Sequence, residues 1–126
     1  MSRIVLIVED TDLCRDTLEL ALMKVPNLAV RAVTSAEEAL DCLDSGEVCA
    51  LVTDLHLPVM DGFALIKAVR AQPKRSSLPI LVISGDSDPE ISTRVTGLGA
   101  DAYFSKPYSP AAVRSKLEQL IEGCKV

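Results

Sequence analysis

The stretch Ile4-Val5-Leu6-Ile7-Val8, followed at once by Glu9-Asp10, decides the fold class of this 126-residue chain. A short run of branched apolar residues is typical of a strand that is buried on both faces. Two further runs have the same character, at 50–53 and 80–83, and weaker ones lie at 29–33 and 102–104. Strands buried on both faces belong to parallel sheets that helices cover on each side.

Segments of helical length separate these runs. The hydroxyl of Ser35 and the carboxylate of Glu38 form a capping box, which predicts a helix that begins there and ends near Gly46. Ser109 caps the last helix, which runs to about Gly123 with one apolar stripe. The other predicted helices cover Asp12 to about Lys24, Phe63 to about Arg70, and Pro89 to Leu98, and we expect residues 72–79 to form a polar loop.

This alternation of strand and helix predicts an α/β fold, namely a single doubly wound parallel sheet with right-handed crossovers. A chain of this length with 48% hydrophobic residues can bury a core as one domain over residues 1–126. The formal charge of −5 and the lack of a basic run argue against direct nucleic-acid binding by this segment. With aromatic residues at 3% and no long apolar segment, we expect no membrane contact.

The cysteines and the start of the chain indicate the compartment. The four cysteines form no CxxC pair, and His56 is the only histidine, so a zinc site is not expected. The apolar run after Met1 is too short for a signal peptide or a spanning helix. We therefore expect a cytoplasmic protein with reduced thiols.

Polar side chains follow the predicted strands at their carboxyl ends, where ligands bind in open parallel sheets. Clustered carboxylates need a cation, and their oxygens suit Mg²⁺, whose shell a phosphate oxygen often completes. An alternative is that Asp10 or Asp12 merely caps the first helix and that Asp54 is a loop acid. The residues expected at this edge are Glu9, Asp10, Asp54, Ser84, Gly85 and Lys106.

A lysine beside these acids has a specific use. The ammonium of Lys106 can pair with Asp54 and then with phosphate oxygens on that residue. Gly85, next to Ser84, removes side-chain bulk where a tetrahedral group would need space. The strand ends therefore predict a place for a phosphoryl group.

The sequence resembles the receiver domain of two-component response regulators over nearly its whole length. The resemblance implies a flavodoxin-like sheet of five strands in the order 2-1-3-4-5 with five helices. The matching residues are Glu9-Asp10, Asp54-Leu55-His56-Leu57-Pro58-Val59-Met60-Asp61-Gly62, Ser84-Gly85, Tyr103 and Lys106-Pro107.

The resemblance also implies a role for each site residue. Asp54 would accept a phosphoryl group from a phosphohistidine. Asp10, Asp54 and the main-chain carbonyl of His56 would ligate Mg²⁺, and Glu9 would act through a metal-bound water. Lys106 would hold the phosphoryl oxygens. The peptide bond between Lys106 and Pro107 is often cis in this family.

Further residues would transmit the signal and set its duration. Ser84 would turn toward the phosphoryl group and Tyr103 would rotate inward behind it. The face formed by the predicted helix 89–98, the strand at Tyr103 and the last helix would then change. We also predict that His56 and Asp86 tune the lifetime of the acyl phosphate, because both lie near the path of the hydrolytic water.

The expected function is therefore that of a phosphorylatable switch, a signalling module rather than an enzyme with turnover on an external substrate. Its partners would be a sensor histidine kinase or phosphotransfer protein and a downstream effector or fused output domain.

The sequence disfavours three alternative functions. A flavin binder would need a Ser/Thr/Gly-rich phosphate loop where Glu9-Asp10 stands. An aspartyl-phosphate phosphatase would need a second acid at the position of His56. A receiver that binds partners without phosphorylation would lack an acid or the lysine.

Overall fold

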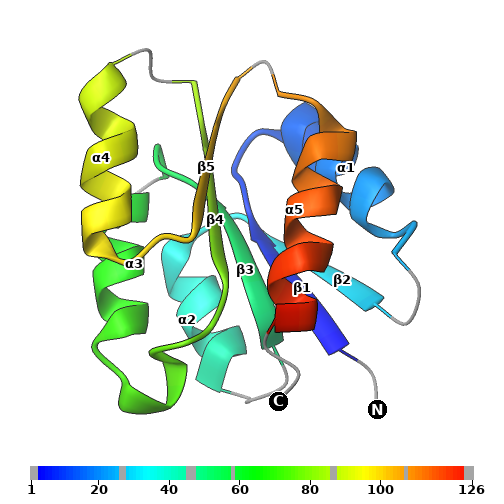
Figure 1. Ribbon diagram of the computed structural model, residues 1–126. Coiled ribbons are helices and arrows are strands. Elements are labelled where there is room, and N and C mark those ends of the chain that lie inside the picture. The colour runs from blue at the N-terminus through cyan, green and yellow to red at the C-terminus, as the bar shows by residue number, and fades with distance from the viewer. Residues whose placement is uncertain are drawn as a thin grey trace.

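The computed structural model describes residues 3–25, 28–44, 48–57, 59–85, 88–106 and 108–123. Strands and helices alternate along the chain (Figure 1). The elements are β1 (Arg3–Val8), α1 (Asp12–Leu22), β2 (Leu28–Val33), α2 (Ala36–Asp44), β3 (Val48–Asp54), α3 (Gly62–Arg70), the 3-10 turn η1 (Pro73–Arg75), β4 (Ile80–Ser84), α4 (Pro89–Leu98), β5 (Ala102–Ser105) and α5 (Pro110–Gly123).

All strand pairings are parallel, and the sheet order is β2-β1-β3-β4-β5. The predicted doubly wound sheet is therefore confirmed. The register pairs Val8 with Thr53, Asp54 with Ile83, and Ser84 with Ser105. The carboxyl ends of the central strands consequently lie at one edge of the sheet, where the polar residues follow them.

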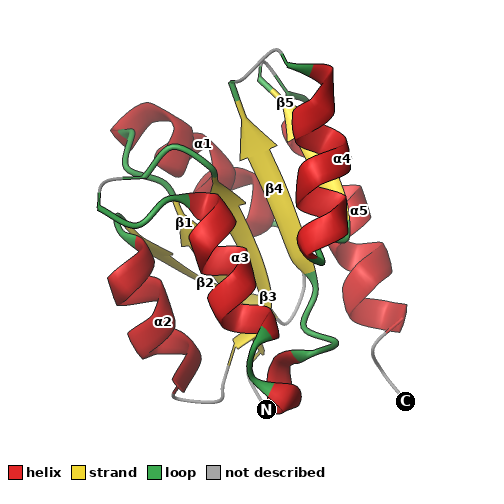
Figure 2. Cartoon of the chain, turned by 90° about the vertical axis from the view of Figure 1, so that its left-hand side faces the viewer, coloured by secondary structure: helices red, strands yellow, loops and turns green. Residues whose placement is uncertain are grey.

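Helices cover both faces of the sheet. Figure 2 shows α2, α3 and α4 in front of one face, and α1 and α5 pack on the other. Alternate residues of each central strand enter the two cores: Leu6 and Leu51 pack under the first set of helices, and Val5 and Val52 under the second. None of the described helices combines the length and the apolar character that crossing a membrane requires.

Ser35 and Ser109 cap their helices as predicted, although the carboxylate of Glu38 accepts from the Ser35 hydroxyl, and the element ends shift by a few residues. The amide of Glu38 donates to the Ser35 hydroxyl at 3.3 Å, and the amide of Ala112 donates to the Ser109 hydroxyl at 3.2 Å. The first helix ends at Leu22 rather than near Lys24. The expected end of the second helix at Gly46 lies outside the described residues.

Residues 72–79 form the expected polar connection between α3 and β4, but this connection has more local structure than the sequence indicates. This segment contains η1, and Arg75 within it is only 7% exposed. The guanidinium of Arg75 pairs with the carboxylate of Asp44 at the end of α2. Because its charge is compensated by Asp44, a residue type that is usually solvated is buried here.

Gly62 joins the loop after β3 to the start of α3 by a close main-chain approach. Its amide donates to the carbonyl of Leu55 at 2.9 Å. A Cβ at this position would lie 2.4 Å from the carbonyl oxygen of Asp54 and 2.7 Å from Cα of Leu55. Only a residue without a side chain lets α3 begin directly beside the end of β3.

Substituting alanine at two glycines should therefore have opposite effects. Gly62→Ala should lower the free energy of unfolding by about 3 kcal/mol, because the backbone of β3 must move to admit the methyl group. A Cβ at Gly97 in α4 would meet no atom of the described residues within 4 Å, so Gly97→Ala should raise the free energy of unfolding by about 0.5–1 kcal/mol through helix propensity. Urea unfolding measures both, and equal effects at the two sites would contradict the close approach.

Candidate functional site

Three carboxylates gather at the carboxyl edge of the sheet. One oxygen each from Glu9, Asp10 and Asp54 lies within 4.8 Å of the others. Glu9 and Asp54 are 1% and 6% exposed, whereas Asp10 is exposed. The acids that follow β1 and end β3 are thus brought together, in the donor set that hard divalent cations prefer.

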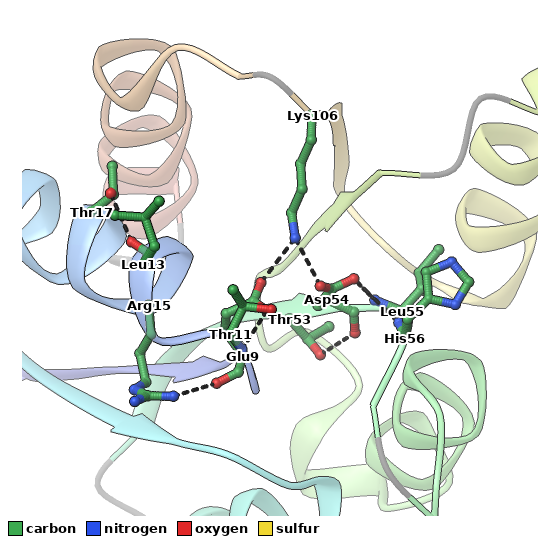
Figure 3. Close-up of polar contacts among 10 residues, drawn as sticks. All are labelled: Glu9, Thr11, Leu13, Arg15, Thr17, Thr53, Asp54, Leu55, His56 and Lys106. Carbon is green, nitrogen blue, oxygen red and sulfur yellow. Dashed lines mark hydrogen bonds and ion pairs between the residues drawn. The ribbon is translucent and has the colours of Figure 1, made fainter.

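Lys106 compensates the two buried members of this cluster. Its Nζ lies 2.9 Å from Oδ2 of Asp54 and 3.2 Å from Oε2 of Glu9 (Figure 3). The main chain positions the lysine, because the amide of Lys106 donates to the carbonyl of Ser84 at 2.8 Å. This hydrogen bond extends the β4–β5 pairing by one residue beyond Ser105. One ammonium therefore bridges the ends of β1 and β3, although Lys106 follows β5, which β4 separates from β3 in the sheet.

The second oxygen of Asp54 is held by the chain that follows it. Oδ1 accepts hydrogen bonds from the amides of Leu55 at 2.6 Å and His56 at 3.2 Å. The hydroxyl of Thr53 donates to the main-chain carbonyl of Asp54 at 2.8 Å. The carboxylate is thus fixed between two main-chain amides and the Lys106 ammonium, as Figure 3 shows.

The charges in this cluster act on one another. Burial, followed by the negative charge of Asp54, raises the pKa of Glu9, and these effects outweigh the opposing influence of the Thr11 amide and Lys106. Burial would lower the pKa of Lys106, but the hydrogen bond and charge of Asp54, joined by Glu9, raise it well above its usual value. The lysine therefore stays charged, and ionised Glu9 is unfavourable in the folded protein.

The expected switch residues flank the lysine. Ser84 is fully buried at the end of β4, and Tyr103 is half-buried in β5. Tyr103, Gly85 and Lys106 line a hollow of about 340 Å³ at this edge. Among the described residues, a Cβ on Gly85 would contact only Cδ of Lys106, at an ordinary 3.8 Å. The expectation that Gly85 leaves space for a phosphoryl group stays a prediction.

Three other expectations concern His56, Asp86 and the bond to Pro107. His56 is exposed, and Figure 3 draws its imidazole beside Asp54 on the side away from Glu9. Asp86 and the peptide bond to Pro107 lie outside the described residues. The predicted influence of Asp86 on the acyl phosphate and the predicted cis bond therefore stay predictions.

The helix-capping alternative for the first acids is wrong. The N-cap of α1 is Thr11, not Asp10 or Asp12, and its side chain makes no capping hydrogen bond. The amide of Thr11 instead donates to Oε1 of Glu9 at 3.1 Å. The acids after β1 are thus organised around the site rather than around the start of the helix.

Arg15 also belongs to the carboxyl edge of the sheet, although the sequence does not predict it. Its Nη1 donates to the carbonyl of Glu9 at 3.0 Å, and its Nη2 pairs with the carboxylate of Asp12 (Figure 3 draws the first contact). The sequence contains only a weak signal for this role, since an arginine three residues after an aspartate on a helix is usually a surface ion pair.

The fold and the strand-end cluster agree with comparisons to known proteins. The family model of the response regulator receiver domain matches residues 5–118. The chain belongs to this family. It is accordingly the receiver domain of a two-component response regulator, a phosphoacceptor module of signal transduction.

Similar proteins include regulators of different lengths. The two-component response regulator ORR8 of Oryza sativa subsp. indica is 38% identical over 104 residues, which are 82% of this chain and 85% of that protein. The regulatory protein VanR of Enterococcus faecium is 33% identical over 99% of this chain but only 52% of its own length. A crystal structure of a putative response regulator from Chloroflexus aurantiacus has a TM-score of 0.89 at 32% identity, with 97% of this chain and 99% of that chain covered.

Removing the charge of Glu9 should stabilise the metal-free protein. Glu9→Gln should raise the free energy of unfolding at pH 7 by about 1 kcal/mol, because an amide oxygen can still accept from Thr11 without a buried negative charge. The raised pKa of Glu9 favours the protonated form in the folded state, so the contribution of Glu9 to the stability of the parent is fully present below the ordinary value of 4.5 and is lost as the pH rises through the raised pKa. The advantage of Glu9→Gln over the parent therefore appears as the pH rises.

Urea unfolding between about pH 4 and pH 7, in the presence of a chelator, measures this effect. The parent should lose the Glu9 contribution across that window, whereas Glu9→Gln should not. Asp41→Asn on the exposed side of α2 serves as the control and should follow the parent. A pH profile of Glu9→Gln identical to that of the parent would contradict the assignment.

Proposed function

We propose that Asp54 is the phosphoacceptor of a signalling switch and that Lys106 is the group that receives the phosphoryl charge. The observation that carries this proposal is the bridge from the ammonium of Lys106 to Asp54 at 2.9 Å and to Glu9 at 3.2 Å. Asp54 is the member of the acid cluster that ends a central strand and faces this lysine. Its fixed carboxylate is suited to nucleophilic attack in a defined direction.

The proposed transfer is a displacement at phosphorus. An oxygen of Asp54 forms a bond to the phosphorus of a phosphohistidine on a kinase or phosphotransfer protein, and the bond from phosphorus to the imidazole nitrogen breaks. The electron pair of that bond returns to the donor imidazole. Lys106 leaves Glu9 to bind the phosphoryl oxygens, so that the new negative charge is compensated by a cation already at the site.

The acid cluster fits the Mg²⁺ that receiver domains generally use. Its donors are carboxylate oxygens on two buried residues and one exposed residue, which leaves one side open to water and to a phosphoryl oxygen. Asp10, Asp54 and the carbonyl of His56 would hold the ion, with Glu9 acting through a water. When bound, Mg²⁺ supplies compensation of the charge on the transferred group.

The proposed output is a change in the α4–β5–α5 face. Ser84 is buried beside Lys106, and Tyr103 borders the neighbouring hollow, so a phosphoryl group that draws Ser84 toward it would vacate space for the ring. A second contact links the acceptor side to α4. The guanidinium of Arg94 lies 4.0 Å from the ring centroid of Phe63, directly after Gly62.

Some parts of the proposal concern the cellular setting. The phosphodonor would be a sensor histidine kinase or a phosphotransfer protein, and the output would be read by an effector or an output domain. We infer that residues 1–126 act as one receiver domain. The tuning of the acyl-phosphate lifetime by His56 and Asp86 remains part of this proposal.

Labelling with acetyl phosphate tests the acceptor. The parent should gain one phosphoryl group in the presence of Mg²⁺, as seen by intact mass, and should lose this adduct when Mg²⁺ is chelated. Asp54→Asn should abolish the adduct, because the amide is not a nucleophile of this kind. Asp61→Asn is a matched control, since Asp61 caps α3 through the amide of Ala64 and asparagine also caps helices. Equal labelling of the two variants would show that another carboxylate is the acceptor.

Amide hydrogen exchange tests the proposed output. Addition of Mg²⁺ and beryllium fluoride, a phosphoryl mimic, should change exchange at the acid cluster and also across residues 85–108. Asp54→Asn should show neither change. If exchange in the parent changed only beside Asp10 and Asp54, the proposed propagation to α4 and β5 would be wrong while the acceptor assignment would stand.

A further inference from the structure

Asp10 is the least constrained member of the acid cluster. Its side chain is exposed, and it makes no hydrogen bond or ion pair within the part of the chain that the structure describes. One of its oxygens nevertheless lies within 4.8 Å of carboxylate oxygens from Glu9 and Asp54. Like charges repel, and an exposed side chain can turn toward water, so the main chain must hold Asp10 toward the cluster.

The main chain next to Asp10 is fastened at three points. The amide of Glu9 donates to the carbonyl of Val33 in β2 at 3.1 Å. The amide of Thr11 donates to Oε1 of Glu9 at 3.1 Å. The carbonyl of Glu9, which belongs to the peptide that joins it to Asp10, accepts from Nη1 of Arg15 at 3.0 Å. Arg15 thus holds the peptide plane from which Asp10 projects.

The surroundings of Arg15 suit it to hold the peptide between Glu9 and Asp10 in place. Its side chain is only 18% exposed, so the bond to Glu9 is largely shielded from water, whereas the partner carboxylate of Asp12 is 86% exposed. The amide of Arg15 also donates to the carbonyl of Thr11 at 3.0 Å in the first turn of α1. The planar guanidinium therefore connects the end of β1 to α1, because one of its NH2 groups binds the Glu9 carbonyl and the other binds the Asp12 carboxylate.

We propose that Arg15 is a positioning residue for Mg²⁺: it holds the Glu9–Asp10 peptide so that the Asp10 carboxylate faces Glu9 and Asp54. This inference rests on the proposed function of the acid cluster. The positioning role and a purely electrostatic role predict opposite changes in Mg²⁺ affinity when Arg15 is replaced. A nearby positive charge repels Mg²⁺, so its removal alone would strengthen binding, whereas loss of the peptide contact would weaken binding.

Calorimetric titration with Mg²⁺ separates these roles. Arg15→Ala should raise the dissociation constant for Mg²⁺ about tenfold, as is typical when the support of a metal ligand is lost. Arg15→Lys keeps the charge and can reach only one partner at a time, so it should recover part of the affinity. Asp12→Asn removes the ion pair but leaves the bond from Arg15 to Glu9, and should stay within about twofold of the parent.

A second readout distinguishes positioning from general stability. In chemical unfolding, a merely structural role would lower the stability of Arg15→Ala equally with and without Mg²⁺. Positioning should also reduce the stabilisation that Mg²⁺ adds. Acetyl phosphate should label Asp54 of Arg15→Ala poorly at low Mg²⁺ and near the parent level at saturating Mg²⁺. If Arg15→Ala does not fold, the comparison of Arg15→Lys with the parent decides the question.

The outcomes are distinguishable from a failure of the proposed function. Mg²⁺ affinity of Arg15→Ala, or of folded Arg15→Lys if alanine does not fold, equal to or tighter than that of the parent would overturn the positioning role and leave Asp54 as acceptor. A folded parent that binds no Mg²⁺ would overturn both. Weaker binding in Arg15→Ala with parent-like binding in Asp12→Asn would support the inference.

Discussion

The ammonium of Lys106 lies between two buried carboxylates, and the arrangement of the whole edge depends on this contact. Without it, Glu9 and Asp54 would be buried negative charges within 4.8 Å of each other and of Asp10. Neighbouring buried charges of one sign are costly unless a cation compensates them. The lysine holds the Asp54 carboxylate by an ion pair and leaves it next to an exposed side where Asp10 lies. A site organised in this way holds a counter-charge for its own carboxylates.

The parallel sheet makes this contact possible. Glu9 follows β1, Asp54 ends β3 and Lys106 follows β5, so residues far apart in sequence meet because their strands end at one edge. Short main-chain contacts then set the details: the carbonyl of Ser84 fixes the backbone of Lys106, and the missing side chain of Gly62 lets α3 begin beside Asp54. The main-chain contacts that shape the fold therefore also position the residues of the site.

The strands and the acid cluster could be predicted because both depend on simple rules. Apolar runs of strand length, separated by helical segments, predict parallel strands, and parallel strands place Glu9, Asp54 and Lys106 at a common edge. The strand order came from the family resemblance, since the pattern of one sequence does not select it. The burial of Arg75 and the bond from Arg15 to Glu9 could not be predicted. Both depend on the path of the main chain and on a carbonyl as partner, and arginine in such sequence contexts is most often solvated.

The central claim is that Lys106 compensates the acid cluster at rest and transfers to the phosphoryl group in the active state. The most direct test is a crystal structure of the protein with Mg²⁺ and beryllium fluoride. The account predicts beryllium bonded to an oxygen of Asp54, with the ammonium of Lys106 on a fluoride and no longer on Glu9, and Mg²⁺ bound beside Asp10. An adduct on another carboxylate, or Lys106 still bridging Glu9 and Asp54 in the presence of the adduct, would contradict it.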